Sequence, residues 1–371
     1  MKVKTVLHIT RRIGGGAGEA SSRLHQALLN NGVASKLLVL WPEESHIFHD
    51  SFFLWAKKNQ KIRLFIYQLL SRLHIYNLIF QAPYTSILNI CNHPEVKKAD
   101  LIILHQVDNF INARTFLSKT QDKSICWRCP DFQPLTGKPY PSKLRWIWKG
   151  VRFPNKFKWV FTTETARKIA LEELPLMNEK STLTIPNIIP ANIINSAQQN
   201  HFPRTKSMVF ISVNIHDERK GLQHLLEIWP ALEKRGYALD VIGDYNFEMS
   251  NHEKITYHGS LSSTEIFKIL ARSLFLITPA KQEMFGQTSI ESLICGTPVI
   301  STPTIGAMDI LTEYENGIFI KCNDSLNGHS ILEAIDEFEK TPWNNDQISM
   351  NSRVKYHEDK SLLYLNKISS L

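Results

Sequence analysis

The chain has 371 residues, of which 43% are hydrophobic and 21% are charged. This length is too great for one ordinary core and suits two domains, and no apolar run approaches the roughly 20 residues that a membrane span needs. The formal net charge of +8 favours an anionic partner, such as nucleic acid, an anionic membrane surface or a phosphorylated substrate. Nucleic acid ranks last, because the sequence has no zinc-finger, RNP or basic-zipper signature.

The first residues and the cysteines indicate the compartment. Residues 1–10 form a short apolar stretch with no cleavage site after it, which predicts a buried strand and not a secretory signal. The five cysteines are too few and too scattered for a disulfide scaffold. Cys126 and Cys129 form one CxxC pair without a second pair at zinc-ribbon spacing, so we interpret them as small hydrophobic residues near a strand end. A reduced, cytoplasmic location follows.

Strand-like and helix-like segments alternate along the first half of the chain. A helix is expected at residues 17–31, ending at Gly32. Strands are expected at residues 3–10, 35–40, 99–105, 124–127 and 158–162. This alternation predicts a parallel sheet with helices on both faces.

The alternation restarts after a turn at residues 186–190 and a polar linker at residues 197–206. Strands are expected at residues 208–213, 238–242, 255–258, 274–278 and 297–301, and helices at residues 221–235, 263–273 and 285–296. We therefore predict an α/β fold of two Rossmann-like, doubly wound domains that face a cleft. The expected domains are residues 1–195 and residues 206–345, with a helical segment, residues 346–371, that packs back on the N-terminal domain.

Two acids flank a predicted helix start with seven residues between them: Glu283 and Glu291. A helix N-terminus attracts phosphate, and Gly286 allows a close backbone approach. A carboxylate can accept hydrogen bonds from both vicinal hydroxyls of a ribose. We interpret one acid as a ligand of a sugar and the other as a ligand of a ribose, with the diphosphate between them. The alternative is an acid at a helix N-terminus plus a surface acid.

A basic pair, Arg219 and Lys220, stands just before Gly221, where a strand gives way to a helix. Cations at this point can bind a leaving diphosphate and neutralise the charge that builds as the glycosidic bond breaks. The alternative is a solvated charge run, which is common.

Three glycines, Gly14 to Gly16, lie between the first predicted strand and its helix. Such a loop can lie flat against a phosphate or sugar, or it can be a flexible turn. It is not the dinucleotide fingerprint, because a G-x-G-x-x-G register from Gly14 needs glycine where Glu19 stands. This excludes a nicotinamide enzyme.

These residues carry a resemblance to a known family. The chain resembles a family-4 glycosyltransferase, a retaining enzyme of the GT-B architecture, most specifically over residues 208–322. The resemblance rests on the E-x7-E motif, on "ESLICGTPVIST" and "NGIFI", and on "RKG" before a helix. The N-terminal half resembles the exopolysaccharide and colanic-acid branch through "GGGAGEASSRLHQALLNNG", "ADLIILHQVDNFIN" and "WRCPDFQPLTGKPY".

The resemblance implies roles for individual residues. Glu283 contacts the donor sugar, and Lys220 binds the diphosphate. The family arginine is expected near Asn214, where this sequence has none, and Arg219 is the candidate substitute. Glu291 binds the nucleotide ribose. From the helix start and the glycine loop, we also predict as donor-binding residues Phe285, Gly286, Gln287, Thr288, Asn214, Gly15 and Gly16.

Acceptor-binding candidates lie in the N-terminal half. They are Arg11 beside the glycines, His105 at the end of a predicted strand, and Asp131, where many relatives have a histidine-aspartate pair and this chain has Pro130-Asp131. His105 has an alternative role as a structural histidine. Residues 55–80 and 143–159 combine cations with aromatic and aliphatic side chains, which predicts attachment to an anionic membrane surface. The alternative is a core helix and a basic loop.

Together these features predict a hexosyltransferase that moves a hexose from a nucleotide-sugar to a hydroxyl of a lipid-linked glycan, with retention, in surface polysaccharide biosynthesis. The protein is expected in the cytoplasm, peripherally attached to the membrane. No cofactor or metal is expected, because protein cations and a helix dipole can neutralise the diphosphate. The alternatives are a non-hydrolysing nucleotide-sugar epimerase and a catalytically silent GT-B binding subunit.

Overall fold

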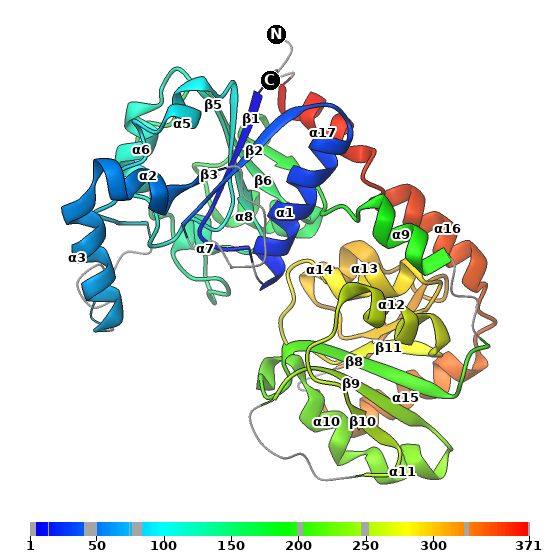
Figure 1. Ribbon diagram of the computed structural model, residues 1–371. Coiled ribbons are helices and arrows are strands. Elements are labelled where there is room, and N and C mark those ends of the chain that lie inside the picture. Colours follow the sequence, from blue (N-terminus) through cyan, green and yellow to red (C-terminus); the bar gives the residue numbers. More distant parts are fainter. Residues whose placement is uncertain are drawn as a thin grey trace. The chain divides into compact units, whose positions relative to one another are not determined.

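The computed structural model describes residues 5–13, 15–40, 50–73, 75, 84–198, 203–245, 252–322 and 326–369. The chain divides into two units (Figure 1). The first unit combines Met1–Ile188 with Glu358–Leu371, and the second is Ile189–His357. The predicted fold class, two doubly wound α/β units, is confirmed.

The first unit is built on a parallel sheet whose described strands run in the order β3-β2-β1-β4-β5-β6-β7. These strands are β1 (Thr5–Thr10), β2 (Ala34–Val39), β3 (Asp50–Ser51), β4 (Leu101–Leu104), β5 (Ser124–Cys129), β6 (Lys156–Phe161) and β7 (Thr182–Thr184). The central strands are buried on both faces, which is the pattern of a parallel sheet covered by helices. Cys126 and Cys129 lie free and buried on β5, which confirms their interpretation as small hydrophobic residues.

Helices cover this sheet and connect its strands. They are α1 (Gly15–Asn30), α2 (Phe52–Asn59), α3 (Lys61–Arg72), α5 (Pro94–Lys98), α6 (Ala113–Lys119), α7 (Gln133–Thr136), α8 (Glu164–Glu173) and α17 (Lys360–Ser369). Leu24 and Leu28 of α1 share a core cluster with Tyr364 and Leu365 of α17 and with strand residues such as Ile103. The C-terminal helix thus completes the core of the first unit.

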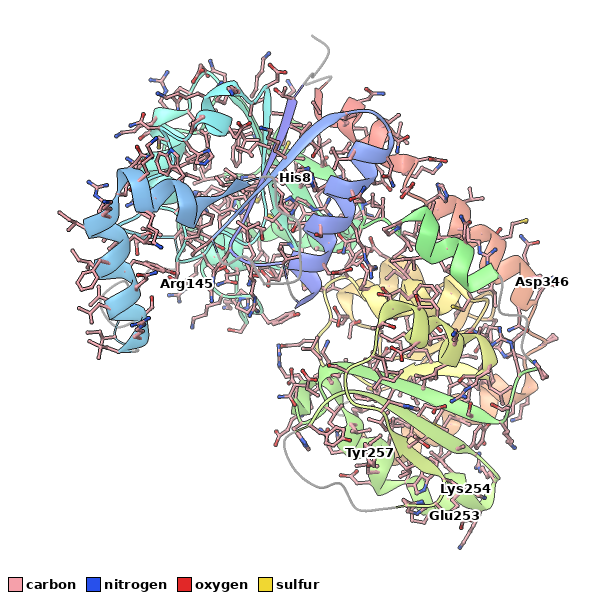
Figure 2. All side chains as sticks on the ribbon, viewed as in Figure 1. His8, Arg145, Glu253, Lys254, Tyr257 and Asp346 are labelled. Atoms are coloured by element: carbon pink, nitrogen blue, oxygen red, sulfur yellow. The ribbon has the colours of Figure 1, made fainter. Side chains whose placement is uncertain are left out.

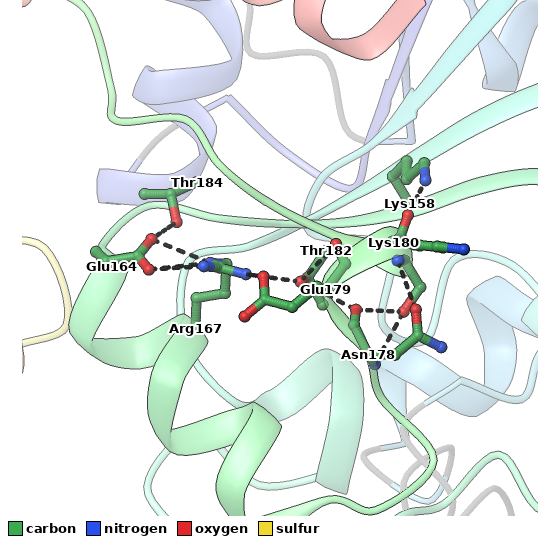
Figure 3. Close-up of polar contacts among 9 residues, drawn as sticks. Lys158, Glu164, Arg167, Asn178, Glu179, Lys180, Thr182 and Thr184 are labelled. Carbon is green, nitrogen blue, oxygen red and sulfur yellow. Dashed lines mark hydrogen bonds and ion pairs between the residues drawn. The ribbon is translucent and has the colours of Figure 1, made fainter. Parts of the chain in front are cut away.

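A polar network fastens α8 to the edge strand β7 (Figure 3). The Arg167 guanidinium donates to both carboxylate oxygens of Glu164, at 2.7 to 3.2 Å, and to Thr182 Oγ1 at 3.1 Å. It also pairs with Glu179 of the short 3-10 helix η1 (Glu179–Ser181). The hydroxyl of Thr184 donates to Glu164. These bonds hold the carboxyl end of β7 against the start of α8.

The second unit is built on a parallel sheet whose described strands run in the order β10-β9-β8-β11-β12-β13. These strands are β8 (Ser207–Asn214), β9 (Ala238–Asp244), β10 (Ile255–Tyr257), β11 (Phe275–Thr278), β12 (Val299–Ser301) and β13 (Gly317–Phe319). Two apolar clusters lie on its two faces, one around Phe267 and Ile290 and the other around Phe210 and Ile335.

The helices of the second unit are η2 (Glu218–Lys220), α9 (Ala191–Gln198), α10 (Leu222–Glu227), α11 (Trp229–Lys234), α12 (Ser263–Arg272), α13 (Gln287–Ile294), α14 (Ile305–Ile310), α15 (Gly328–Lys340) and α16 (Asn345–Tyr356). The helix predicted at residues 221–235 is interrupted at Ile228, because Pro230 has no N–H to continue the hydrogen-bond ladder of α10. Among the described helices, none is long and apolar enough to cross a membrane.

The unit boundaries differ from the predicted ones. Residues 346–357 belong to the second unit, because Ile348 and Tyr356 of α16 are buried in the core that contains α13. Residues 189–195 also belong to it, and Ile194 of α9 lies in the same core. Of the predicted C-terminal segment, only the residues from Glu358 onward pack on the first unit.

Candidate active site

The loop after β8 holds Lys220 in place through a glycine that no other residue can replace without strain. Asp217 caps η2, its Oδ1 accepting from the backbone N–H of Arg219 at 3.1 Å. Gly221 follows with φ +82°, and a Cβ built on it would lie 2.0 Å from the carbonyl oxygen of Pro279. The backbone N–H of Lys281 donates to Arg219 O at 2.7 Å. The basic loop is therefore pressed against the segment that follows β11.

Glu283 meets Lys220 directly. Glu283 Oε2 lies 2.7 Å from Lys220 Nζ, and about a third of each side chain remains exposed (32% and 29%). Glu283 Oε1 accepts from the backbone N–H groups of Phe285 and Gly286 at 3.4 and 3.3 Å. Burial opposes ionisation of this carboxyl, but the Lys220 ammonium and the two N–H groups outweigh it, so the pKa of Glu283 lies below its usual value.

A small pocket lies beside this pair at the carboxyl ends of β11 and β12. Lys220 and Glu283 line it together with five hydroxyl side chains: Thr278, Thr288, Ser289, Ser301 and Thr304. Sequence reasoning named Thr288 and missed the other four. The available signal was position, because Thr278 and Ser301 are the last residues of their strands, where ligands of open parallel sheets bind.

The predicted helix start begins two residues later than expected. Gly286, with φ +83°, precedes α13, which begins at Gln287. The Phe285 side chain is buried in the core, so this residue offers only its backbone N–H. Gly306 of α14 packs against the same turn, where its Cβ would lie 2.5 Å from the carbonyl carbon of Phe285, and its N–H donates to Glu283 O at 2.9 Å. The turn that carries Glu283 is thus held from two sides.

Glu291 lies apart from the pocket that Glu283 lines. It is 6% exposed on α13, and its Oε1 is 3.5 Å from Gln287 Nε2. Gln287 precedes it by one helical turn and lies nearer the helix start.

Arg219 forms its ion pair within its own turn and not with Glu283. Its guanidinium makes two bonds to the Asp217 carboxylate, at 3.0 and 2.6 Å. The Arg219 side chain is 51% exposed. Asn214, at the end of β8, is exposed, and its Oδ1 accepts from the His216 N–H at 2.9 Å. The structure therefore brings Lys220 to Glu283 and leaves Arg219 and Asn214 on the exposed part of the loop.

The acceptor candidate His105 lies inside the first unit. It directly follows β4, is 3% exposed, and its Nε2 lies 2.9 Å from Nδ1 of His8 on β1. Figure 2 shows His8 within the body of this unit. Burial lowers the pKa of both histidines well below the usual value, so the pair is neutral at pH 7. This geometry corresponds to the structural alternative for His105.

Arg11 and Asp131 are held by neighbouring groups. Arg11 Nη1 is 2.5 Å from Asp108 Oδ2. Asp131 Oδ1 accepts from the Gln133 N–H at 2.8 Å. Burial, with the nearby Asp108 charge, raises the pKa of Asp131 to about 6 despite that hydrogen bond. Asp131 therefore titrates close to neutral pH.

The glycine loop and the tryptophan segment differ from their predictions. Gly15 and Gly16 form the first turn of α1 and not a loop before it, and Gly14 lies outside the described residues. The close approach occurs at Gly18, whose Cβ would lie 2.2 Å from Ile13 O. In residues 143–159, Trp148 and Trp159 are 2% and 3% exposed and cannot insert into a membrane. Cations of that segment, such as Arg145, reach the surface, and Trp146 is half-buried (Figure 2).

The arrangement in the second unit suits a ligand with both phosphate and hydroxyl groups. A lysine and a helix start supply positive charge for a diphosphate. An ionised carboxylate and the pocket hydroxyls supply hydrogen-bond acceptors and donors for a sugar. The residues named in this site belong to the second unit.

Known proteins resemble part of this chain in sequence. Residues 194–355 match the family model described as Glycosyl transferases group 1. An uncharacterized 41.2 kDa protein in the cps region of Klebsiella pneumoniae is 23% identical over 154 residues, which are 41% of this chain and 42% of that protein. The chain thus spans less than half the length of this relative.

Solved structures resemble the whole chain in fold. Sucrose-phosphate synthase from Thermosynechococcus elongatus is similar with a TM-score of 0.67 and 14% identity, over 99% of this chain and 98% of that one. The Anabaena protein HepE in complex with UDP-glucose is similar with a TM-score of 0.62 and 14% identity, over 99% and 100%. The fold is therefore that of the GT-B glycosyltransferases. The residues that match the family model, 194–355, lie in the second unit.

Proposed function

We propose that this protein is a retaining hexosyltransferase that moves a hexose from a nucleotide-sugar to a hydroxyl of a glycan acceptor. The observation that carries the proposal is the Lys220–Glu283 pair beside the start of α13, in a pocket lined with hydroxyls. A cation and a carboxylate in contact match the two halves of a nucleotide-sugar, whose diphosphate is anionic and whose hexose bears hydroxyls.

In the proposed reaction the diphosphate leaves while positive groups stabilise its charge. Lys220 and the N-terminus of α13, residues 287–288, supply that charge. Glu283 orients the hexose, and the acceptor hydroxyl attacks from the face that the diphosphate leaves. Glu291 anchors the ribose, with Gln287 as its neighbour on the helix. We also propose that no metal takes part, so a chelator should leave transfer unchanged.

Two relatives favour the finer features of this proposal. The similar HepE structure contains UDP-glucose, which favours a nucleotide-hexose as the donor. The similar Klebsiella protein lies in a cps region, which is consistent with a role in surface polysaccharide biosynthesis. A role in polysaccharide biosynthesis makes a growing glycan the proposed acceptor.

We further propose that the acceptor is lipid-linked and that the protein attaches peripherally to the cytoplasmic face of a membrane. The support is α3 in the first unit. Its exposed apolar side chains include Ile62 and Phe65, 77% and 65% exposed, and its cations include Lys61 and Arg63. Such a helix suits the interface of an anionic bilayer.

A donor-only assay tests the proposed activity against its alternatives. The purified protein is incubated with UDP-, GDP- and ADP-sugars without acceptor, and products are separated by chromatography. A transferase slowly hydrolyses one donor, an epimerase changes the sugar while it stays on the nucleotide, and a silent binding subunit does neither. Epimerisation, or no turnover of any donor, would overturn the proposal.

A further inference from the structure

A second cavity, of ≈ 410 Å³, lies in the first unit between α3 and the start of α6, whereas Lys220 and Glu283 belong to the second unit. This volume falls within the range of small-molecule pockets, roughly 300 to 1,000 Å³. Its apolar lining residues are Ile66, Ile87, Leu88, Ile90, Ile111 and Phe116. Arg63 also lines it and is exposed. Polar side chains line it as well: Ser86, Asn89, Asn112 and Thr115. The cavity therefore combines apolar side chains with polar ones and with a cation that solvent can reach.

The helix on one side of the cavity carries an apolar stripe that is exposed among the described residues. Ile62, Phe65, Ile66, Leu69 and Leu73 are 41% to 77% exposed. Their spacing places them along one face of α3, while the buried residues Leu64 and Tyr67 are on its other face. Ile66 belongs to both the stripe and the cavity. Figure 1 shows α3 at the margin of the first unit. A contiguous exposed stripe of this kind marks an interaction site.

Among the described residues that line the cavity, Arg63 is the charged one. The sequence has no Asp or Glu from residue 51 to residue 94. The same stretch has five cations: Lys57, Lys58, Lys61, Arg63 and Arg72. An anionic group at Arg63 therefore meets a cation, and no carboxylate of this stretch repels it.

Hydrogen bonds fix the walls of the cavity. The Gln60 side chain pairs with the backbone of Asn89, its Oε1 accepting from the Asn89 N–H at 3.1 Å and its Nε2 donating to Asn89 O. On the facing wall, Asn112 caps α6 by accepting from the Thr115 N–H at 3.1 Å. The pocket is thus formed by anchored backbone segments, which lowers the ordering cost of binding.

We propose that this cavity binds the hydrocarbon chain of a single-chain lipid phosphate, with Arg63 at the phosphate. The inference rests on the proposed function in one respect: this lipid would carry the acceptor glycan. The apolar lining matches the chain, and the basic entrance matches the phosphate. A volume of ≈ 410 Å³ is at the small end of ligand pockets, which favours one chain over the two of a phospholipid.

Calorimetric titration of the full chain tests the proposal without relying on transfer. The probes are farnesyl phosphate, dodecyl phosphate, farnesol, inorganic phosphate and the two-chain lipid dihexanoyl phosphatidylglycerol. Thr115 lines the cavity and is half-buried, whereas Ser118 is exposed on the same helix and does not line it. Thr115→Trp should weaken farnesyl phosphate binding at least about tenfold, and Ser118→Trp should leave it unchanged. Preference for farnesyl over dodecyl phosphate would identify an isoprenoid carrier, and the reverse order an acyl carrier.

Charge variants test the position of the phosphate. Arg63→Gln should weaken binding of farnesyl phosphate and not of farnesol, while Arg72→Gln on the same helix should change neither. Equal binding by wild type and Thr115→Trp, tighter binding of the two-chain lipid, or no binding of either chain phosphate would overturn the proposal. Thermal stabilisation by a nucleotide-sugar in the same samples reports on the donor site, so failure at the cavity is distinguishable from failure of the proposed function.

Discussion

Lys220 Nζ lies 2.7 Å from Glu283 Oε2, although 63 positions separate the two residues in the sequence. Two loops after different strands of one sheet bring them together, at the edge where such sheets bind ligands. In the absence of a donor each side chain neutralises the other. The diphosphate of a bound nucleotide-sugar would attract the Lys220 ammonium. The Glu283 carboxylate would then accept hydrogen bonds from the hexose.

The first prediction concerns the charge of Glu283. Glu283→Gln keeps the size of the side chain and removes its charge, so the hexose loses an ionised acceptor. We expect transfer to fall at least about 100-fold, as for loss of one group that stabilises a transition state. Initial rates with a matched donor and acceptor measure this. Glu253→Gln, at an exposed residue before β10 (Figure 2), is the control and should keep wild-type activity. A Glu283→Gln rate within about twofold of wild type would refute the assigned role.

The second prediction compares two glycines with the same backbone conformation. Gly221 and Gly236 both have φ +82°, but a Cβ meets Pro279 O at 2.0 Å in the first case and no atom within 4 Å in the second. Gly236→Ala should cost about 1 kcal/mol of stability, the usual cost of a left-handed residue. Gly221→Ala should cost more and should also weaken nucleotide binding, because the loop that holds Lys220 must move. Urea unfolding and nucleotide titration measure both effects. Equal losses in the two variants would contradict this account.

The third prediction concerns the pH dependence of stability through Asp131. Its pKa is raised to about 6 in the folded protein, so the folded state binds the proton more tightly than the unfolded state. The stabilisation that protonated Asp131 contributes is therefore fully present below the unfolded pKa of about 3.9. It is lost as pH rises through about 6, by about 3 kcal/mol. Asp131→Asn should be more stable than wild type at pH 7.5 and should match it near pH 4. Urea unfolding of both proteins at these pH values measures the difference. A difference that does not change with pH would show that the folded pKa is not raised.

The fourth prediction concerns membrane attachment. The double variant Ile62→Glu with Phe65→Glu places two charges on the exposed stripe of α3. We expect its binding to anionic vesicles at low salt to fall at least about tenfold, because apolar insertion and charge attraction are both reduced. Vesicle sedimentation measures it. Val354→Glu, at an equally exposed position of the second unit (65% exposed), should bind like wild type. Wild-type protein that stays in the supernatant would refute attachment.

The sequence predicted what depends on local pattern and spacing. The alternation of strands and helices identified the fold class, and the E-x7-E and RKG motifs identified Glu283 and Lys220. Each of these features is contained in a short window. The elements that the windows describe are present in the structure within a few residues.

The remaining features depend on contacts between distant segments, which a single sequence does not encode locally. His8 lies on β1, and His105 directly follows the neighbouring strand β4. The side-chain partner of His105 is therefore a residue 97 positions away in the sequence. The helical segment at residues 346–371 was predicted to pack on the first unit, yet Ile348 of α16 is buried in the core of the second unit. In residues 143–159 the aromatic and basic pattern fitted a membrane surface, yet Trp148 is buried and donates to Pro134 O at 2.7 Å.

The most direct test of the central claim is equilibrium titration of three proteins with a panel of UDP-, GDP- and ADP-sugars. They are the wild type, Lys220→Gln, and Lys254→Gln as the control. Lys254 is exposed just before β10, at the opposite edge of the sheet from the site (Figure 2). We predict that one nucleotide-sugar binds the wild type and Lys254→Gln equally and binds Lys220→Gln at least about tenfold more weakly. Equal affinity for all three proteins, or no binding to the wild type, would contradict the assignment of this pocket to the donor.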